Sequence, residues 1–450
     1  MDSLLDKAVE EFNNLNDKPI KIVAHFDSDG ISSASILIKA LSKKNKKFVL
    51  RIVKQLNKNI LDELKQEEYD TFMFLDLGSG YINLIKDILI GKKIFILDHH
   101  IPESEDSGGI IHVNPHIIGM ENSSGTVSGS GISYLFCKEL DGENIDSAHL
   151  AVIGALGDMQ DFEGINKEIL KDSINSGMLE IKKGLKMFGF QTKPLAKILM
   201  YSPDIYIPGI TGSEDATIQF LNELNIKLKE NGRFRTLSDL NEEEMKNLIT
   251  GIILRRMRSE ENPEDIIGDI YLLKNENEGS ATKDAKEFST LLNSCGRMGK
   301  PSLGIGLCLG SEEMKYKAFD LGKEYKIEII KSLDWFYSNK KKFIEGDNYI
   351  IINAGDNVQD AIIGTLASMV SKSRIYPDGK IIIAMAYTLD NKIKLSARFS
   401  GKEDLDLKNI LGKIAGEKNI GGHKFACGGF IDINEEEKFI EKAKEVLNKL

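Results

Sequence analysis

Cysteine is scarce in this sequence of 450 residues, which contains only Cys137, Cys295, Cys308 and Cys427. No two of them form a CxxC pair, and they are too scattered for a dense framework of disulfides. This spacing argues against a zinc ribbon and against the cross-linked scaffold of a small secreted domain. We therefore expect four reduced thiols, most of them buried.

Long apolar runs are also missing, since none approaches the roughly 20 consecutive residues that a membrane-spanning helix requires. The first residues, MDSLLDKAVEEFNNL, lack the basic and apolar regions of a signal peptide. Apolar residues make up 41% and charged residues 28% of the sequence, as in ordinary globular proteins. We expect a cytoplasmic protein of two or three domains that does not bind a membrane.

Positive charge is in deficit, because the formal net charge is −10 at pH 7. That balance argues against a protein that coats nucleic acid through a generally basic surface, but it allows a locally basic groove. Only nine of the 59 basic residues are arginines, which makes each arginine more informative than a lysine. Aromatic residues make up only 7%, and Tyr376 and Phe425 are no more than candidates for stacking on a base.

The first third of the sequence alternates short apolar runs with segments of helical length and spacing. The apolar runs predict buried strands, and the segments between them predict helices. Such alternation is typical of parallel β-α-β units with helices on both faces of one sheet. The predicted strands are 20–26, 48–53, 71–77 and 93–99, and the predicted helices are 32–42, 58–66, 81–90, 126–140 and 145–157.

Two further regions follow this alternating segment. Residues 165–345 are charge-rich and mainly helical in pattern, which predicts a connector with an inserted helical region. Residues 347–450 mix strands and helices again, with a hairpin turn at 387–392 and a glycine-rich loop at 421–429. The predicted fold class is α/β: an N-terminal doubly wound parallel sheet, a helical connector and insert, and a smaller C-terminal α/β domain.

Acidic and imidazole side chains gather where three of the predicted strands end. In an open parallel sheet, ligands bind beyond the carboxyl ends of the strands, so these side chains should line one crevice. A fourth acidic group, Asp158 and Asp161, follows a predicted helix that could close the same crevice. The residues at the strand ends are His25, Asp27, Asp29, Asp76, Asp98, His99 and His100.

Clustered carboxylates repel one another, and divalent cations would neutralise them. Mixed carboxylate and imidazole ligands favour Mn²⁺ or another first-row ion such as Co²⁺, with Mg²⁺ as an alternative where oxygen ligands dominate. Two ions about 3.5–4 Å apart would clamp a phosphoryl group and activate a water molecule. A central strand ends at Asp76, which is well placed to bridge both ions.

Simpler interpretations exist for each residue taken alone. A single Asp at a strand end is commonly the N-cap of the next helix, and Asp29 before Gly30 could form a turn. His99 and His100 could be ordinary strand-end residues. Three of only seven histidines lie at these ends, however, and this coincidence favours a metal site.

The strand-end residues resemble the motifs of a known family. The sequence is similar to the DHH phosphoesterases in four motifs: His25-Phe-Asp27-Ser-Asp29, Asp76, Asp98-His99-His100 and Asp158. A fifth segment, Gly421-Gly422-His423, resembles the signature of the companion DHHA1 domain. The resemblance implies a DHH catalytic domain at 1–185, a helical connector and insert at 186–345, and a DHHA1 substrate-binding domain at 346–450.

The resemblance implies a set of metal ligands. Asp27 and Asp29 would each bind one of two divalent ions, and Asp76 would bridge the two. His99 and Asp158 would complete the ligands of the second ion.

The same resemblance assigns roles to three neighbouring residues. His25 would be a ligand of the first ion or lie next to its ligands. His100 would face the scissile phosphate or act as a further ligand. Asp98 would hold an imidazole in one tautomer, and it forms the predicted catalytic pair with His100.

Two more segments are similar to RecJ-type members of the family. Residues 292–299 (LNSCGRMG) are similar to their Asn-Ala-(Ala/Cys)-Gly-Arg segment, and residues 394–398 (KLSAR) resemble the DHHA1 strand that contacts phosphates. Glycines also allow a ligand to approach their N–H groups closely. The implied substrate contacts are Arg297, Ser396, Arg398, Gly421, Gly422 and His423.

These substrate contacts also have simpler interpretations. Arg398 could pair with a neighbouring Glu on the surface, and Arg297 could tie the connector to a domain. The glycines could form a tight turn with a packed histidine.

Two weaker candidates remain. Residues 122–126 could bind phosphate at a helix N-terminus or form a flexible loop. Arg255, Arg256 and Arg258 form a charged helix face by default, and a docking surface is the minority interpretation.

The best match of these motifs is an archaeal RecJ-like exonuclease, of the group related to the nuclease that binds the GINS complex of the replisome. We expect it to digest single-stranded DNA or RNA to nucleoside 5′-monophosphates, with 5′→3′ digestion of DNA favoured, in DNA repair or replication. The alternatives are an oligoribonuclease or cyclic-dinucleotide phosphodiesterase, a 3′→5′ RNA exonuclease, and a replisome component that docks on GINS. A pyrophosphatase is disfavoured, because those relatives have a different C-terminal domain.

Overall fold

The computed structural model describes the whole chain except residues 105–107, 121–126, 202–204, 374, 402–404 and 417–419. The described residues form two compact units, Met1–Gly322 and Lys323–Leu450. No helix among them combines the length and the apolar character needed to cross a membrane.

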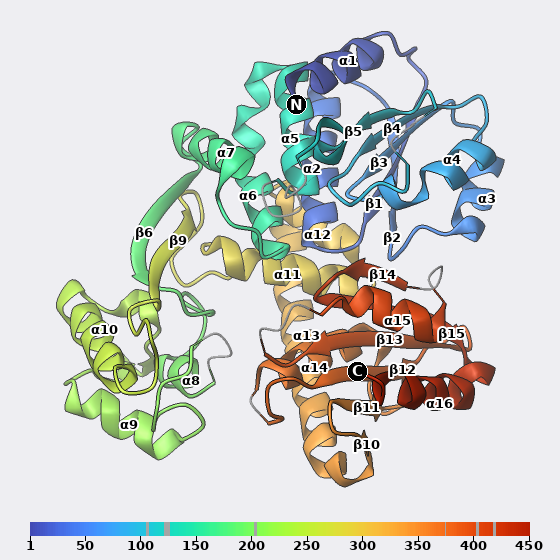
Figure 1. The fold of residues 1–450 in the computed structure, drawn as a ribbon. Helices are drawn as coiled ribbons and strands as arrows, with labels where there is room; N and C mark the ends of the chain where they lie inside the picture. Colours follow the sequence, from blue (N-terminus) through green and yellow to red (C-terminus); the bar gives the residue numbers. More distant parts are fainter. Residues whose placement is uncertain (105–107, 121–126, 202–204, 374, 402–404, 417–419) are drawn as a thin grey trace. The chain divides into compact units, whose positions relative to one another are not determined.

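A five-stranded parallel sheet organises the N-terminal part of the first unit (Figure 1). Its strands lie in the order β2-β1-β3-β4-β5. Strand β2 therefore pairs with one side of β1, and β3, β4 and β5 follow on the other side. Four of these strands were predicted from their apolar runs, and the three-residue edge strand β5 was not. The strands are β1 (Ile20–His25), β2 (Phe48–Val53), β3 (Thr71–Leu75), β4 (Lys93–Leu97) and β5 (Ile111–Val113).

Helices cover both faces of this sheet, which confirms the predicted doubly wound fold. One apolar core includes Phe12, Leu37 and Phe136 from helices on one face. A second core, with Leu61 and Ile85, lies on the other face under two shorter helices. The first face is covered by α1 (Asp2–Asn13), α2 (Ser28–Lys43), α5 (Gly129–Leu140) and α6 (Ala148–Gly157), and the second by α3 (Lys58–Gln66) and α4 (Ile82–Ile88).

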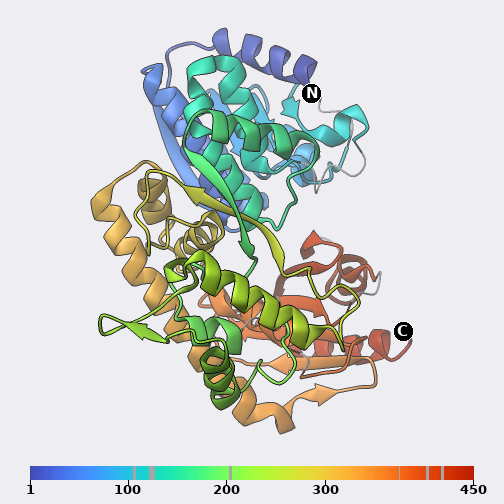
Figure 2. The same cartoon turned by 90° about the vertical axis from the view of Figure 1, so that its left-hand side faces the viewer.

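The middle region contains strands that the sequence pattern did not predict. After α7 (Gly164–Asn175), β6 (Leu179–Leu185) pairs antiparallel with β9 (Ile267–Leu273) along its whole length. Figure 2 shows this two-stranded ribbon, in green and yellow. The middle region is otherwise mainly helical, as predicted. The sequence pattern did not predict this ribbon, because the exposed centre of β6 carries lysines instead of an apolar run.

The ribbon leads to a small subdomain with its own core. Its core side chains include Leu199, Ile207, Leu221 and Leu248. Its elements are α8 (Leu195–Met200), α9 (Glu214–Glu223), the hairpin of β7 (Lys229–Glu230) and β8 (Arg233–Phe234), and α10 (Glu242–Arg256).

The chain then returns to the first core through α11 (Ala285–Arg297) and α12 (Pro301–Cys308). Helix α13 (Glu312–Asn339) begins in the first unit and ends in the second. All four cysteines are buried free thiols, as predicted.

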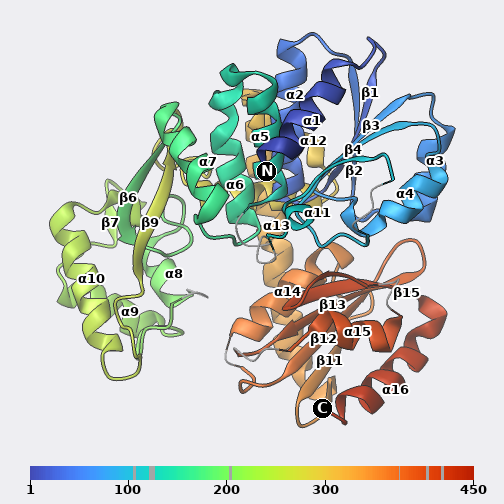
Figure 3. The ribbon, with the colours of Figure 1, turned by 45° about the horizontal axis from the view of Figure 1, so that its top comes forward.

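The second unit is built on a six-stranded mixed sheet in the order β10-β11-β12-β13-β15-β14. Only the β11–β12 pair is parallel. Figure 3 shows this sheet with α14 on one side and α15 and α16 on the other. The strands are β10 (Ile344–Glu345), β11 (Tyr349–Asn353), β12 (Ile381–Tyr387), β13 (Lys392–Phe399), β14 (Ile420–His423) and β15 (Ala426–Asp432), and the helices are α14 (Asp360–Lys372), α15 (Leu407–Ala415) and α16 (Glu436–Leu447).

Two turn predictions have different outcomes in this unit. The hairpin between Tyr387 and Lys392 is confirmed, and Asn391 takes the left-handed conformation at its tip, with φ of 57°. The prediction of a glycine-rich loop was wrong for Gly421 and Gly422, which lie in the edge strand β14. Glycine is required at position 422, where φ is 110° and an added Cβ would lie 2.6 Å from the Ala426 carbonyl oxygen.

Candidate metal centre

The first acidic loop joins β1 to α2. Asp27 is the N-cap of α2, as the simpler interpretation held, because its Oδ1 accepts a hydrogen bond of 3.0 Å from Gly30 N. Its Oδ2 lies 2.9 Å from Nδ1 of His25. The same carboxylate therefore caps the helix and contacts an imidazole of the candidate metal centre. A Cβ at Gly30 would lie 2.6 Å from the carbonyl carbon of His25, which explains the glycine.

Helix α11 also contacts this loop, although it lies more than 250 residues later in the sequence. Asn293 Oδ1 accepts a hydrogen bond of 3.0 Å from Ser28 N. A Cβ at Gly296 would collide with the backbone oxygen of Phe26, so only glycine lets the helix approach this closely. The RecJ-like segment therefore contacts the first acidic loop through its Asn and its Gly.

Asp29 is completely buried at the N-terminus of α5. Its carboxylate accepts hydrogen bonds from Gly129 N at 2.6 Å and from Ser130 N at 3.0 Å, and a third from the Ser130 hydroxyl. Burial, with the negative charges of Asp76 and Asp158, nevertheless raises the pKa of Asp29 well above its ordinary value. This carboxylate would therefore gain from a nearby cation.

Asp76 lies at the end of the central strand β3 in a left-handed conformation, with φ of 56°. Non-glycine residues seldom adopt this conformation, and it often marks a functional site. A Cβ at Gly129 would lie 2.7 Å from the Cβ of Asp76, so a glycine lets α5 approach. Among the described residues, no hydrogen-bond donor satisfies the buried Oδ1 of Asp76.

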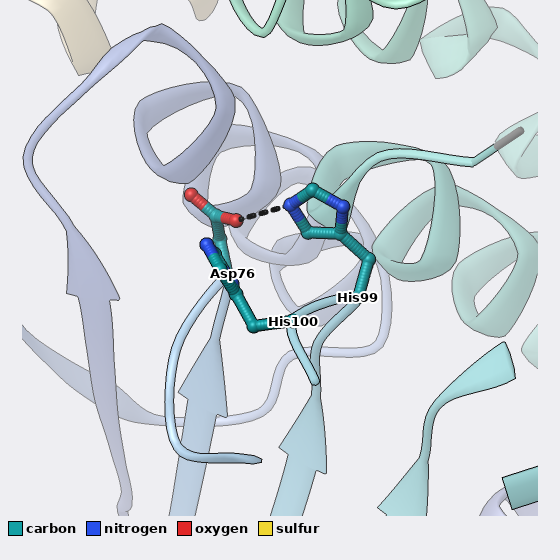
Figure 4. Close-up of side chains that lie close together, drawn as sticks. All are labelled: Asp76, His99 and His100. Atoms are coloured by element: carbon teal, nitrogen blue, oxygen red, sulfur yellow. Dashed lines mark ion pairs between the residues drawn. The ribbon is translucent and has the colours of Figure 1, made fainter. Parts of the chain in front are cut away.

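The His99 imidazole points at three carboxylates. Its Nε2 lies 3.2 Å from Asp158 Oδ2, 3.4 Å from Asp76 Oδ1 and 3.9 Å from Asp29 Oδ2. Figure 4 shows the contact with Asp76. These carboxylates outweigh burial and raise the pKa of His99 well above its ordinary value. On the other side of the ring, Gln160 Nε2 lies 3.3 Å from Nδ1.

Asp98 lies behind the two histidines and is completely buried. Its Oδ1 accepts hydrogen bonds from His99 N at 2.8 Å and His100 Nδ1 at 2.7 Å, and its Oδ2 accepts one from Ser79 N at 2.9 Å. Despite burial, the neighbouring imidazoles hold the pKa of Asp98 far below its ordinary value. Asp98 is therefore ionised and accepts a hydrogen bond from His100, while its predicted role in holding the tautomer stays a prediction.

Three overlapping groups of side chains offer ligand atoms that all lie within 4.8 Å of one another. Two of the groups share Asp76 and two share His99, which is the pattern that two adjacent ions would need. The donors are carboxylates and imidazoles, which suit first-row divalent ions. The groups are His25-Asp27-Asp76, Asp76-His99-His100 and Asp29-His99-Asp158, and we call these seven residues the metal cluster.

The structure thus brings together every metal ligand that the sequence predicted. The assignment of each ligand to one ion remains a prediction. Asp161 is exposed and takes no part in the three groups. The candidate segment 122–126 lies outside the described residues.

Most of the predicted substrate contacts lie in the second unit. Arg398 Nε donates a hydrogen bond of 2.7 Å to Ser368 Oγ, and one NH group donates to Ala397 O at 2.8 Å. Ser396 is on the same strand, and the sheet register places Arg398 opposite Ala426, which is opposite His423. Arg297 is in the first unit, at the end of α11.

Two of the remaining candidates, Tyr376 and Arg256, have structural explanations. Tyr376 is 8% exposed and packs edge-on against Phe336, so it belongs to a core, and its role in base stacking is corrected. Phe425 is 59% exposed. Arg256 is buried and pairs with Asp265 at 2.7 Å, which makes it an internal tie of the subdomain instead of part of a charged face.

Sequence reasoning missed three polar residues around the cluster. Gln160 contacts His99, while Ser79 and Asn114 lie behind Asp98 and His100. All three are buried. Polar residues in loops carry no periodic signal, although Gln160 lies only two positions after Asp158.

Comparisons with known proteins match three segments of the chain to family models. Residues 19–157 match the DHH family, N-terminal domain, residues 187–269 match the DHH-CID domain, and residues 346–449 match the DHHA1 domain. An uncharacterized protein of Methanocaldococcus jannaschii is 30% identical over 444 residues, covering 95% of this chain and 93% of the relative.

Several solved structures share the fold at low sequence identity. RecJ from Thermus thermophilus in complex with Mn²⁺ has a TM-score of 0.59 at 14% identity; the match covers 100% of this chain but only 54% of that one. Exonuclease RecJ bound to manganese has a TM-score of 0.59 at 13% identity, covering 99% and 94% of the two chains. CDC45 from Entamoeba histolytica has a TM-score of 0.67 at 12% identity, covering 99% and 98%.

A doubly wound sheet with clustered carboxylates and imidazoles at its strand ends defines a class of α/β protein with a candidate metal site at the carboxyl edge of its sheet. Within that class, the chain belongs to the DHH family, with a DHHA1 domain at its C-terminal end and a RecJ-like fold. Family and fold together indicate a metal-dependent phosphoesterase.

Proposed function

We propose that the protein is a metal-dependent exonuclease that hydrolyses single-stranded nucleic acid to nucleoside 5′-monophosphates, with 5′→3′ digestion of DNA favoured. One observation carries the proposal: three ligand groups with all ligand atoms within 4.8 Å overlap at Asp76 and His99. Such overlap supports two adjacent divalent ions, for which Mn²⁺ is favoured and Mg²⁺ or Co²⁺ are alternatives.

Divalent ions at the metal cluster would supply the positive charge that stabilises the transition state of phosphodiester hydrolysis. The ligands for one ion would be His25 and Asp27, those for the other Asp29, His99 and Asp158, and Asp76 would serve both.

His100 has a separate role in the proposal. Because Asp98 is an ionised acceptor, the Nδ1 of a neutral His100 carries the hydrogen and Nε2 is the unprotonated nitrogen. His100 could therefore act as a further metal ligand through Nε2, beside Asp76, or accept a proton there.

The second unit supplies the proposed contacts with the nucleic-acid backbone. Arg398 is held by Ser368 and by a backbone carbonyl, so its guanidinium is oriented before the substrate binds. A planar guanidinium is suited to phosphate oxygens.

The first experiment would follow a 5′-labelled single-stranded DNA oligomer on a gel after addition of protein and Mn²⁺. Immediate release of labelled mononucleotide supports 5′→3′ digestion, and a descending ladder that keeps its label indicates 3′→5′ digestion. Asp158→Ala should abolish either pattern, whereas Asp161→Ala, its exposed neighbour outside the ligand groups, should leave it unchanged. Normal cleavage by Asp158→Ala would contradict the metal assignment.

A dinucleotide or a cyclic dinucleotide, offered in competition with the long strand, separates the small-substrate alternatives. If the short substrate is cleaved much faster, the protein is an oligoribonuclease or a cyclic-dinucleotide phosphodiesterase. A labelled RNA strand of the same sequence tests the RNA exonuclease.

A second candidate function is docking on the GINS complex of the replisome. Its support is the DHH-CID match at residues 187–269, together with the fold likeness to CDC45. Pull-down with the full chain from native extract would test it, using Arg256→Ala to weaken the subdomain and Arg398→Ala as a control in the other unit. Failure of the wild-type chain to recover GINS subunits would remove this candidate.

A further inference from the structure

Asn114 follows the edge strand β5 and is completely buried. It offers no ligand atom to the three groups of the metal cluster. Its amide nevertheless lies directly behind two of the loops that carry ligands, and both of those loops depend on it for hydrogen bonds.

The side-chain nitrogen of Asn114 makes two hydrogen bonds. It donates to Ser79 Oγ at 2.9 Å and to the backbone oxygen of His100 at 2.8 Å. An amide nitrogen carries two hydrogens, so these two bonds use both of them. The orientation of the amide is fixed as well, because Oδ1 accepts a hydrogen bond of 2.9 Å from His116 N.

The two acceptors belong to different ligand-bearing loops. Ser79 lies three residues after Asp76 in the loop that follows β3, and His100 lies in the loop that follows β4. The Ser79 hydroxyl also contacts Nε2 of the buried His112 at 2.9 Å, which holds it in place for Asn114.

Ser79 closes a ring of contacts around the catalytic pair. Its backbone N–H donates to Asp98 Oδ2 at 2.9 Å, and Asp98 Oδ1 accepts from Nδ1 of His100. Asn114 therefore reaches His100 twice: directly through the backbone oxygen, and indirectly through Ser79 and Asp98.

We propose that Asn114 is a positioning residue that sets the distance between the loop of Asp76 and the loop of His99 and His100. This inference rests on the proposed function, because that distance decides whether Asp76 and the two histidines can bind ions together. Partners of this kind, one step behind the ligands, commonly change metal affinity or activity by about 10- to 100-fold when they are removed.

Two substitutions at this position separate shape from hydrogen bonding. Asn114→Asp keeps the shape but turns a carboxylate oxygen toward the His100 carbonyl, where both atoms are acceptors. Asn114→Ala removes both donors. Ser79→Ala is a milder change, because it leaves the bond between Asn114 and His100 in place, and it keeps the test valid if the Asn114 variants fold poorly.

The chain offers a matched control in Asn144. It is also buried, and its side-chain nitrogen donates to a backbone oxygen, that of Cys137, at 2.8 Å. It offers no ligand atom to the metal cluster. Asn144→Ala therefore reports what the loss of a buried amide does to the fold alone.

The test is calorimetric titration of the metal-free full chain with Mn²⁺, followed by cleavage kinetics on single-stranded DNA at saturating Mn²⁺. We expect Asn114→Asp and Asn114→Ala to weaken binding of at least one Mn²⁺ by about 10- to 100-fold and to lower kcat with little change in KM. Ser79→Ala should show a smaller loss of the same kind, and Asn144→Ala should bind Mn²⁺ as the wild type does.

Wild-type Mn²⁺ affinity in folded Asn114→Asp or folded Asn114→Ala would overturn the inference. If the Asn114 variants do not fold, wild-type Mn²⁺ affinity in Ser79→Ala would overturn it. An equal loss in Asn144→Ala would overturn it too, because the effect would then come from the fold. The titration does not depend on the substrate: if the wild type binds two Mn²⁺ but cleaves no nucleic acid, the proposed function fails while the role of Asn114 stands.

Discussion

Nδ1 of His100 donates a hydrogen bond of 2.7 Å to Oδ1 of Asp98. This contact leaves Nε2 as the ring nitrogen that can bind a metal ion or accept a proton. The neighbouring imidazoles keep the pKa of Asp98 far below its ordinary value, so the carboxylate is always an acceptor at neutral pH. The tautomer of a neutral His100 is thereby fixed with Nε2 unprotonated.

Asp98→Asn tests this relationship directly. The amide has nearly the same shape, but it can present a donor to Nδ1 and so favour the wrong tautomer. We expect kcat on single-stranded DNA to fall at least about 10- to 100-fold while circular dichroism remains that of the wild type. Activity equal to that of the wild type would show that the tautomer of His100 is unimportant.

Mn²⁺ should stabilise the metal-free protein against unfolding. An ion that binds only the folded state adds about 2.7 kcal/mol per site when its concentration is about 100 times Kd. Asp158→Ala removes a carboxylate that lies 3.2 Å from His99, and it should reduce this gain. Thermal unfolding with and without Mn²⁺ measures the difference, with Asp161→Ala as the control that should keep the full gain.

Arg398→Ala should weaken substrate binding without affecting the metal ions. We expect KM for single-stranded DNA to rise by about tenfold or more, since a charge-assisted hydrogen bond contributes on the order of 1.5–3 kcal/mol. Mn²⁺ affinity from calorimetry should stay the same. Arg255→Ala, which removes an exposed pair with Glu223, is the control, and a similar rise in KM there would contradict a specific role for Arg398.

Met159 follows Asp158 in a left-handed conformation, with φ of 55°, and its side chain is 78% exposed. Asn tolerates this conformation better than Met, so Met159→Asn should stabilise the fold by roughly 0.5–1 kcal/mol in urea unfolding. The reverse exchange at Asn231, where φ is 49°, should destabilise it by a similar amount. A loss of stability in Met159→Asn would mean that contacts of the methionine outweigh its strain.

Burial, with a smaller contribution from the positive charge of Lys39, lowers the pKa of the His149 imidazole to about 4. The unfolded chain binds a proton near pH 6.5, where the folded chain does not, so this residue makes stability fall as the pH drops from about 6.5 to about 4. The difference amounts to on the order of 3 kcal/mol below pH 4.

His149→Gln removes this titration. Urea unfolding between pH 4 and pH 7, without metal, should show a shallower loss of stability at low pH in the variant than in the wild type. Parallel curves for the two proteins would show that His149 is not a neutral buried imidazole.

The N-terminal sheet and the clustering of the candidate metal ligands were predictable because two strong signals coincide there. Apolar runs fix the buried strands, and the geometry of a parallel sheet brings the residues after β1, β3 and β4 to one edge. No comparable signal marked β6, whose centre is exposed, or Gly421, whose residue type is depleted in strands.

The supporting residues were hidden for a different reason. Ser79 and Asn114 are 35 positions apart, and they meet only because β3, β4 and β5 lie side by side. Contacts of this kind depend on the strand order and the loop lengths together. The periodicity of apolar residues within one segment predicts neither of them.

The hydrogen bond between Ser28 and Asn293 joins residues that are 265 positions apart. During synthesis at roughly 5–20 residues per second, the acidic loop after β1 emerges on the order of ten seconds or more before the residue that holds it in place. The inserted subdomain must be made in between. A nascent chain that has passed Asp158 but has not reached Ala285 therefore carries all four aspartates of the metal cluster and lacks α11, whose Asn293 accepts the hydrogen bond from Ser28.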